Sequence, residues 1–250
     1  MTPSELDQEL LRFIAEMGVV QLDQLADLVA DRGVPVDQAA GVARALVASW
    51  GAAGYAETGD LGLGEPWVWA TRTGLNATGL RARSVKPSQK LLRHTHALTD
   101  VRLTLQRTPT WRKSGLWWRS ERSIRSDLGF PALAEHVPDG EVHWPADSGL
   151  PWAGKVWAME VEISPKTVEA TAKVMVEVLT LVAAAGGVPA TTPLPGPASR
   201  YAGLVYFCSP KSVRAVLNAR AEVGSPLSDR ISVYDLPESA TRLNTPKRGW

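Results

Sequence analysis

Two stretches decide the fold of this chain: HVPDGEVHW (136–144) and WAMEVEISPKT (157–167). Each has the character of a short apolar strand that also carries acidic residues. Side chains alternate between the two faces of a strand, so Glu160 and Glu162 share one face. Asp139 lies at one end of the other strand. Either these carboxylates converge as oxygen ligands of Mg²⁺, or they form a charged rim on an ordinary sheet.

The elements around these stretches predict an α/β domain, in an α+β chain, with helices interleaved between the strands of a central sheet. Apolar periodicity and turn residues give the order helix, three strands, helix, strand, helix, strand. The expected elements are a helix over 88–107, strands over 115–121, 141–144 and 156–163, a helix over 165–184, a strand over 201–208, a helix over 212–223 and a strand over 231–234.

The N-terminal part has the pattern of a winged helix-turn-helix domain, with three helices followed by two short strands. The expected helices cover 4–17, 22–29 and 37–50, and the expected strands cover 55–57 and 67–71. We place this domain at residues 1–80 and the α/β domain at residues 81–250. The third helix of such a domain usually enters the DNA major groove, but here it offers only Arg44. The sequence therefore allows two functions for this domain, contact with DNA or contact with another protein.

Charge is distributed unevenly, although the net charge is only +1. Residues 1–71 hold 11 acidic and 3 basic residues, whereas residues 72–127 hold 13 basic and 3 acidic residues. A basic segment of this kind predicts a surface that faces a polyanion, and the alternative is an ordinary solvated face. The candidates for phosphate contacts are Arg44, Arg81, Arg83, Lys86, Arg119 and Arg122.

The single cysteine, Cys208, excludes a disulfide within the chain and a cysteine-rich zinc site. The N-terminus lacks the basic and apolar regions of a signal peptide, and no apolar stretch reaches the ~20 residues of a membrane span. We therefore expect a cytoplasmic protein with no membrane partner.

The acidic strands resemble the core of PD-(D/E)xK nucleases through Pro138–Asp139, a spacer and then Glu160-x-Glu162. The order α-β-β-β-α-β is also that of the superfamily core. The resemblance implies Mg²⁺-dependent phosphodiester hydrolysis, with Asp139 and Glu160 as metal ligands and Glu162 as ligand or general base. Glu162 occupies the position of the usual lysine. Under this resemblance, Lys166 would stabilise the transition state. Glu121 would be an additional acidic metal ligand.

A wider resemblance covers nearly the whole chain. The segments LDQLADLV, GYAET, EPWVWATRTGLNATGL, HTHALTDVRLTL, SERSIR, HVPDGEVHW, WAMEVEISPKT and YAGLVYFCSP are similar to those of the replication-relaxation family. That family occurs on actinobacterial plasmids, integrative elements and phages. The resemblance implies a role in replication or mobilisation of such an element's DNA. DNA is then the expected partner, together with replication or transfer proteins of the element, and a homodimer is left open.

Three function classes remain open at this point: a Mg²⁺-dependent endonuclease, a non-catalytic DNA-binding or recruitment protein with a degenerate nuclease fold, and a protein-interaction adaptor. Glu141 and His143 alternate onto one strand face, where they could support the site or simply face solvent. His136 is expected in a loop. Most tryptophans around the site belong to the core by default, but an exposed one near arginines could stack on an unpaired base. They are Trp111, Trp117, Trp118, Trp144, Trp152 and Trp157.

Overall fold

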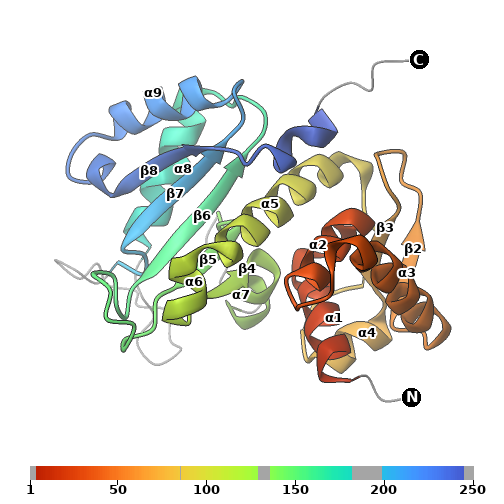
Figure 1. Cartoon of the computed structure of the whole chain (residues 1–250). Coiled ribbons are helices and arrows are strands. Elements are labelled where there is room, and N and C mark those ends of the chain that lie inside the picture. The colour runs from red at the N-terminus through yellow and green to blue at the C-terminus, as the bar shows by residue number, and fades with distance from the viewer. Residues whose placement is uncertain (1–3, 85, 129–135, 182–198, 245–250) are drawn as a thin grey trace. The chain divides into compact units, whose positions relative to one another are not determined.

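The computed structural model describes residues 4–84, 86–128, 136–181 and 199–244. The chain is mixed α/β, as expected, and divides into two compact units whose elements are labelled in Figure 1. Unit 1 comprises Met1–Arg107 and Pro237–Trp250, and unit 2 comprises Thr108–Leu236. Each unit contains a sheet of its own. The acidic strands lie in unit 2.

Unit 1 combines helices with a small antiparallel sheet in the order β1-β3-β2. Its elements are α1 (Glu5–Met17), β1 (Val20–Gln21), α2 (Leu22–Ala30), α3 (Val36–Ala52), β2 (Ala56–Gly59), β3 (Trp67–Ala70), α4 (Arg72–Thr78), α5 (Gln89–Arg107) and η2 (Ser239–Asn244). Helix α1 begins where Ser4 and Asp7 form a capping box, in which each side chain accepts a hydrogen bond from the other's backbone N–H. It ends at Gly18, whose φ of 83° suits a residue without a Cβ.

Helix α5 belongs to unit 1 because buried polar contacts hold it there. Glu16 of α1 lies 2.8 Å from the guanidinium of Arg102, and the amide of Gln24 donates to Asp100 at 2.6 Å. A buried charge needs such a partner, since unpaired burial is costly. Helix α5 therefore groups with unit 1, whose first segment extends to Arg107, whereas the sequence places it within residues 81–250.

Unit 2 is built on a five-stranded mixed sheet in the order β4-β5-β6-β7-β8. The first three strands pair antiparallel, whereas β6, β7 and β8 pair in parallel. Its elements are α6 (Pro109–Ser114), β4 (Trp117–Ser120), α7 (Glu121–Leu128), β5 (Gly140–His143), β6 (Val156–Glu162), α8 (Val168–Thr180), β7 (Gly203–Cys208), α9 (Val213–Val223), η1 (Ser228–Arg230) and β8 (Ile231–Asp235).

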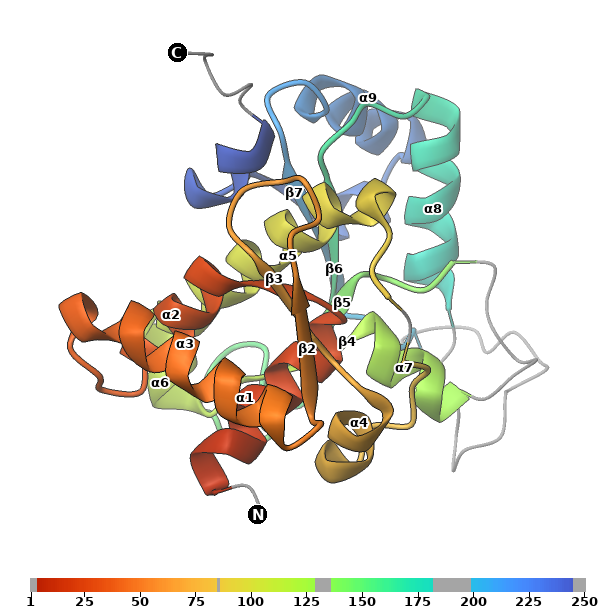
Figure 2. The same cartoon turned by 90° about the vertical axis from the view of Figure 1, so that its right-hand side faces the viewer.

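Helices α8 and α9 cover one face of the parallel part of this sheet, as Figures 1 and 2 show. The buried cluster beneath them includes Ala158, Leu204 and Met175. Strand β7 (GLVYFC) is apolar throughout because it lies between two other strands and most of its residues are buried. At the start of β5, a Cβ on Gly140 would meet the ring of Trp118 at 2.1 Å. Glycine therefore lets Trp118 pack against the backbone directly after Asp139.

Several expected elements differ in detail from the observed ones. Strand β4 ends at Ser120, so Glu121 opens α7 instead of closing a strand. Strand β1 and the short helices α6 and α7 were not expected. The helix expected over 165–184 is observed as α8, and its last expected residues, 182–184, fall outside the described residues.

Candidate functional site

The acidic residues of β5 and β6 share the sheet face on which α8 packs. Glu141 pairs with Ala158 across the two strands, and Ala158 belongs to the cluster under α8. Alternation along β6 then directs Glu160 and Glu162 to the same face. Their neighbours across β7 are Tyr206 and Cys208, which face the same way. The strand pattern thus brings carboxylates to the C-terminal end of β6.

Asp139 lies next to this end of β6, one residue before β5. Its Oδ2 accepts a hydrogen bond of 2.8 Å from the backbone N–H of Val161. The negative charge of Asp139 also acts on Glu160, where it raises the pKa. Asp139 and Glu160 therefore form a close pair of like charges.

Glu160 is the most perturbed carboxyl group of this face. Its residue is only 5% exposed, and burial, followed by the charge of Asp139, raises its pKa to about 7. Nε2 of His136 lies 2.7 Å from Glu160 Oε1 and opposes the rise, as does Lys166. Burial alone would lower the pKa of His136, but its hydrogen bond and charge interaction with Glu160 leave that pKa raised. A pKa near neutrality on a buried carboxyl is a feature of functional sites, although structural networks also produce it.

Glu162 and Lys166 form an ion pair with 2.7 Å between Oε2 and Nζ. Burial lowers the pKa of Lys166, but Glu162, Glu160 and Asp139 outweigh it and leave the pKa raised. Lys166 is therefore a cation that contacts Glu162 and interacts electrostatically with Glu160 and Asp139.

Tyr206 of β7 is the cross-strand neighbour of Glu160. Burial raises its pKa most, and the charges of Glu160, Glu162 and Asp139 raise it further. The three carboxylates thus act electrostatically on one buried phenol of β7. The carboxylate of Glu121 does not join this group. Its backbone N–H donates to the Asp139 carbonyl at 3.2 Å, and its carboxylate pairs with Arg125 at 2.6 Å.

The acidic residues expected as metal ligands differ in their surroundings. Among the residues that the structure describes, no three His, Cys, Asp or Glu side chains form a group that could hold a metal ion. Of the four acidic candidates, Glu121 pairs with Arg125 and Glu162 pairs with Lys166. Asp139 and Glu160 remain together. Two carboxylates fit Mg²⁺, which commonly keeps several waters and binds substrate phosphate oxygens.

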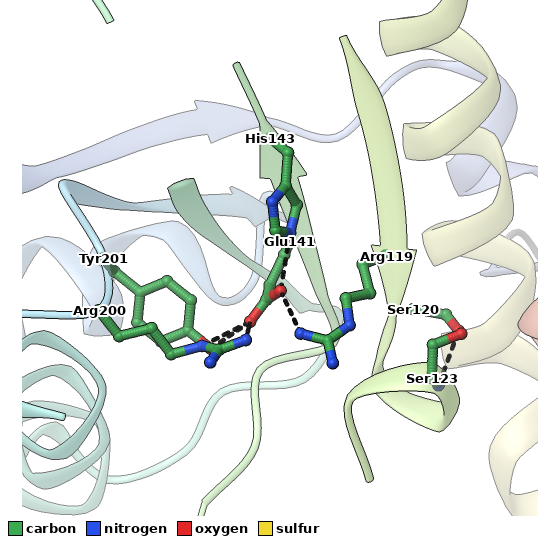
Figure 3. Close-up of polar contacts among 7 residues, drawn as sticks. All are labelled: Arg119, Ser120, Ser123, Glu141, His143, Arg200 and Tyr201. Atoms are coloured by element: carbon green, nitrogen blue, oxygen red, sulfur yellow. Dashed lines mark hydrogen bonds and ion pairs between the residues drawn. The ribbon is translucent and has the colours of Figure 1, made fainter. Parts of the chain in front are cut away.

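A second polar network lies on the same face, centred on Glu141 (Figure 3). The Glu141 side chain has 0% exposure. Its Oε1 accepts from Arg200 Nη2 at 2.6 Å and from the Tyr201 hydroxyl at 2.7 Å. Its Oε2 lies 3.3 Å from Arg119 Nη1 and 2.9 Å from His143 Nε2. Glu141 is therefore a buried hub and not a solvent-facing residue.

The hydrogen-bond donors around Glu141 stabilise its negatively charged form. Burial would raise the pKa of Glu141, but His143, Arg200 and Tyr201 outweigh it and lower the pKa to about 2. Alternation along β5 was the only sequence signal for this network, since Arg200 lies 59 residues away in the chain. His136 was also expected only as a loop residue, because nothing local links it to Glu160.

The basic candidates fall into two groups. Arg44 is exposed on α3, and Arg81, Arg83 and Lys86 are exposed between α4 and α5, all within unit 1. Arg119 and Arg122 belong to unit 2. Arg119 is part of the Glu141 network, and burial lowers the pKa of Arg122.

Comparison with known proteins identifies no relative of this chain. No family model matches the chain, and neither a curated protein nor a solved structure is significantly similar to it. In the part of the chain that the structure describes, no helix is both long and apolar enough to cross a membrane.

Proposed function

We propose that this chain acts on the DNA of a plasmid, integrative element or phage, and that unit 2 is a PD-(D/E)xK-like nuclease module. One observation carries the proposal: Asp139 and Glu160 lie together at the end of a central strand, and the pKa of Glu160 is raised to about 7. Two like charges held in a buried position are stabilised when a divalent cation joins them. The element order supports the same fold, since three antiparallel strands are followed by α8 and the parallel strand β7.

Each residue of the site has a part in the proposed chemistry. Asp139 and Glu160 would hold Mg²⁺, which when bound supplies positive charge against a phosphodiester and lowers the pKa of water. The Lys166 ammonium would stabilise the charge that develops on the phosphoryl oxygens. Glu162 positions Lys166 through their ion pair, and His136 orients the Glu160 carboxylate.

The proposal extends to unit 1 and to the location of the protein. A winged helix is supported by three helices followed by the β2–β3 pair, which with β1 forms the small sheet. The exposed Arg81, Arg83 and Lys86 would contact phosphates. A protein that works on such DNA belongs in the cytoplasm, with replication or transfer proteins as partners.

The test is metal-dependent cleavage by the whole chain. Wild-type protein should cut duplex, single-stranded or branched DNA with Mg²⁺ or Mn²⁺ and stop in chelator. Glu160→Gln should keep the fold and DNA binding but lose cleavage by orders of magnitude, because it lacks a ligand charge. Glu169→Gln is the matched control, since Glu169 is an exposed residue of α8.

A specific observation also favours a second candidate, a non-catalytic DNA-binding or recruitment protein. Lys166 and His136 already neutralise part of the acidic group, and Glu162 stands where the nuclease motif usually has lysine. In that case no DNA form is cut, and a calorimetric titration with Mn²⁺ gives the same trace for wild type and Asp139→Asn. A third candidate, an adaptor that binds proteins through the acidic winged-helix region, residues 1–71, predicts no DNA affinity at all.

A further inference from the structure

Trp117 is an exposed aromatic side chain on the edge strand β4. It is 49% exposed, and its ring stacks on His143 with centroids 3.7 Å apart and an interplanar angle of 16°. The imidazole covers part of the indole and fixes its orientation. A rigid exposed ring loses little conformational entropy when it stacks on another flat ring.

Two arginines are linked to the Trp117–His143 pair through Glu141. His143 bonds to Glu141, and Glu141 holds both Arg119 and Arg200. Two guanidiniums therefore lie around one buried carboxylate. The Arg119 and Arg200 side chains keep 18% and 21% of their surface exposed, so both arginines reach the surface.

The same sheet face connects this region to the acidic site. Asp139, Glu141 and His143 alternate along one side of β5, and Trp117 pairs with His143. A strand rises ~3.3 Å per residue, so about 13 Å of backbone separates Asp139 from His143. A nucleic-acid strand of a few nucleotides spans that distance.

From this juxtaposition we propose that Trp117 is a stacking platform for an unpaired base, with Arg119 and Arg200 attracting the neighbouring phosphates. We call Trp117, Arg119, His143 and Arg200 the platform. Exposed aromatics beside basic groups are the usual means of holding single strands, because every base has a flat face. The platform assigns a substrate class, DNA with a single-stranded segment, to the site proposed above, and it rests on that proposed function.

The experiment compares binding of two DNA forms in chelator, where no cleavage occurs. The probes are a single-stranded oligothymidylate of about 12 nucleotides, within the range of known single-strand sites, and a duplex of equal length. Trp117→Ala should weaken oligothymidylate binding about tenfold, the loss typical of one stacked base, and should change duplex binding by less than about twofold. Trp117→Phe should restore most of the lost affinity, because it keeps an aromatic face.

A matched control comes from the opposite edge of the sheet. Tyr234 of β8 is 55% exposed and stacks on Phe207, so Tyr234→Ala removes a comparable exposed aromatic. It should bind both probes as the wild type does. Circular dichroism checks that each variant is folded.

The outcomes separate the two proposals. Unchanged oligothymidylate binding in Trp117→Ala, or equal losses on both probes, overturns the platform and leaves the nuclease proposal intact. Wild-type protein that binds neither probe overturns both the platform and the proposed action on DNA. Loss of cleavage in Glu160→Gln does not bear on the platform, because binding is measured without metal.

Discussion

Glu160 and His136 form a carboxylate–imidazole pair, with 2.7 Å between Oε1 and Nε2. The pKa of both groups is raised, that of Glu160 to about 7 by burial and by Asp139. The protonation of this pair therefore changes near neutral pH. Two of our predictions depend on this property.

The first concerns stability. An unfolded glutamate titrates near 4.5 and the folded Glu160 near 7, so the folded state binds more protons between these values. The Glu160 contribution to the free energy of unfolding is then fully present below about pH 4.5 and is lost as pH rises through about 7. It amounts to about 3 kcal/mol. Glu160→Gln should remove this part of the pH dependence in urea unfolding in chelator, whereas Glu169→Gln should not. Identical profiles for wild type and Glu160→Gln would contradict the raised pKa.

The second concerns metal affinity. Protons compete with a cation for Glu160, so Mn²⁺ affinity should increase as pH rises through about 7. The His136 hydrogen bond lowers the pKa of Glu160, so His136→Ala should move this increase to higher pH. Calorimetric titrations over a pH series measure the shift. A pH-independent affinity would show that the ion does not bind through Glu160.

Glu141 gives a prediction on folding. Glu141→Gln should destabilise unit 2 by about 3–5 kcal/mol, because it removes the buried carboxylate with which Arg119 and Arg200 both pair. Glu121→Gln breaks only the exposed pair with Arg125 and should cost about 0–1 kcal/mol. Chemical unfolding of both variants provides the comparison. Equal and small losses would mean that the network contributes little to stability.

Lys166 allows chemistry to be separated from metal binding. Lys166→Ala should lower the cleavage rate, because the amine acts on the developing charge. It should not weaken Mn²⁺ binding, since removing a nearby cation leaves Asp139 and Glu160 in place. Single-turnover cleavage and calorimetry on the same preparation measure both quantities. A loss of metal binding in step with the rate would instead make Lys166 a structural support of the ligands.

The exposed basic residues of unit 1 predict a salt effect. Reversing the charge of Arg81, Arg83 and Lys86 together should weaken binding to all duplex sequences alike. The slope of log affinity against log salt should fall by about 3, since each phosphate contact contributes about 0.9. Fluorescence anisotropy at several salt concentrations checks this. If only Arg44→Glu weakened binding, the contact would lie on α3 instead.

Local sequence patterns were sufficient to predict many strands and helices of unit 2. Alternation in WAMEVEI correctly places Glu160 and Glu162 on one face, because the strand period depends only on neighbouring residues. The apolar run in residues 201–208 indicates a buried strand, and β7 lies there. Such predictions need no knowledge of the rest of the chain.

Contacts over long distances could not be predicted in this way. The buried role of Glu141 depends on Arg200, and the place of α5 depends on pairs such as Gln24 with Asp100, which are 76 residues apart. The boundary expected after residue 80 places α5 in the second domain. No pattern within α5 itself identifies its partners in α1 and α2.

The position of η2 has a consequence for the order of folding during synthesis. This helix follows all of unit 2 in the chain, yet it packs on α5 in unit 1, with Ala240 fully buried. A ribosome therefore releases the whole of unit 2 before the last piece of unit 1 emerges. The unit that begins first is completed last, and a premature stop codon after residue 236 would leave α5 without this neighbour while sparing every strand of the larger sheet.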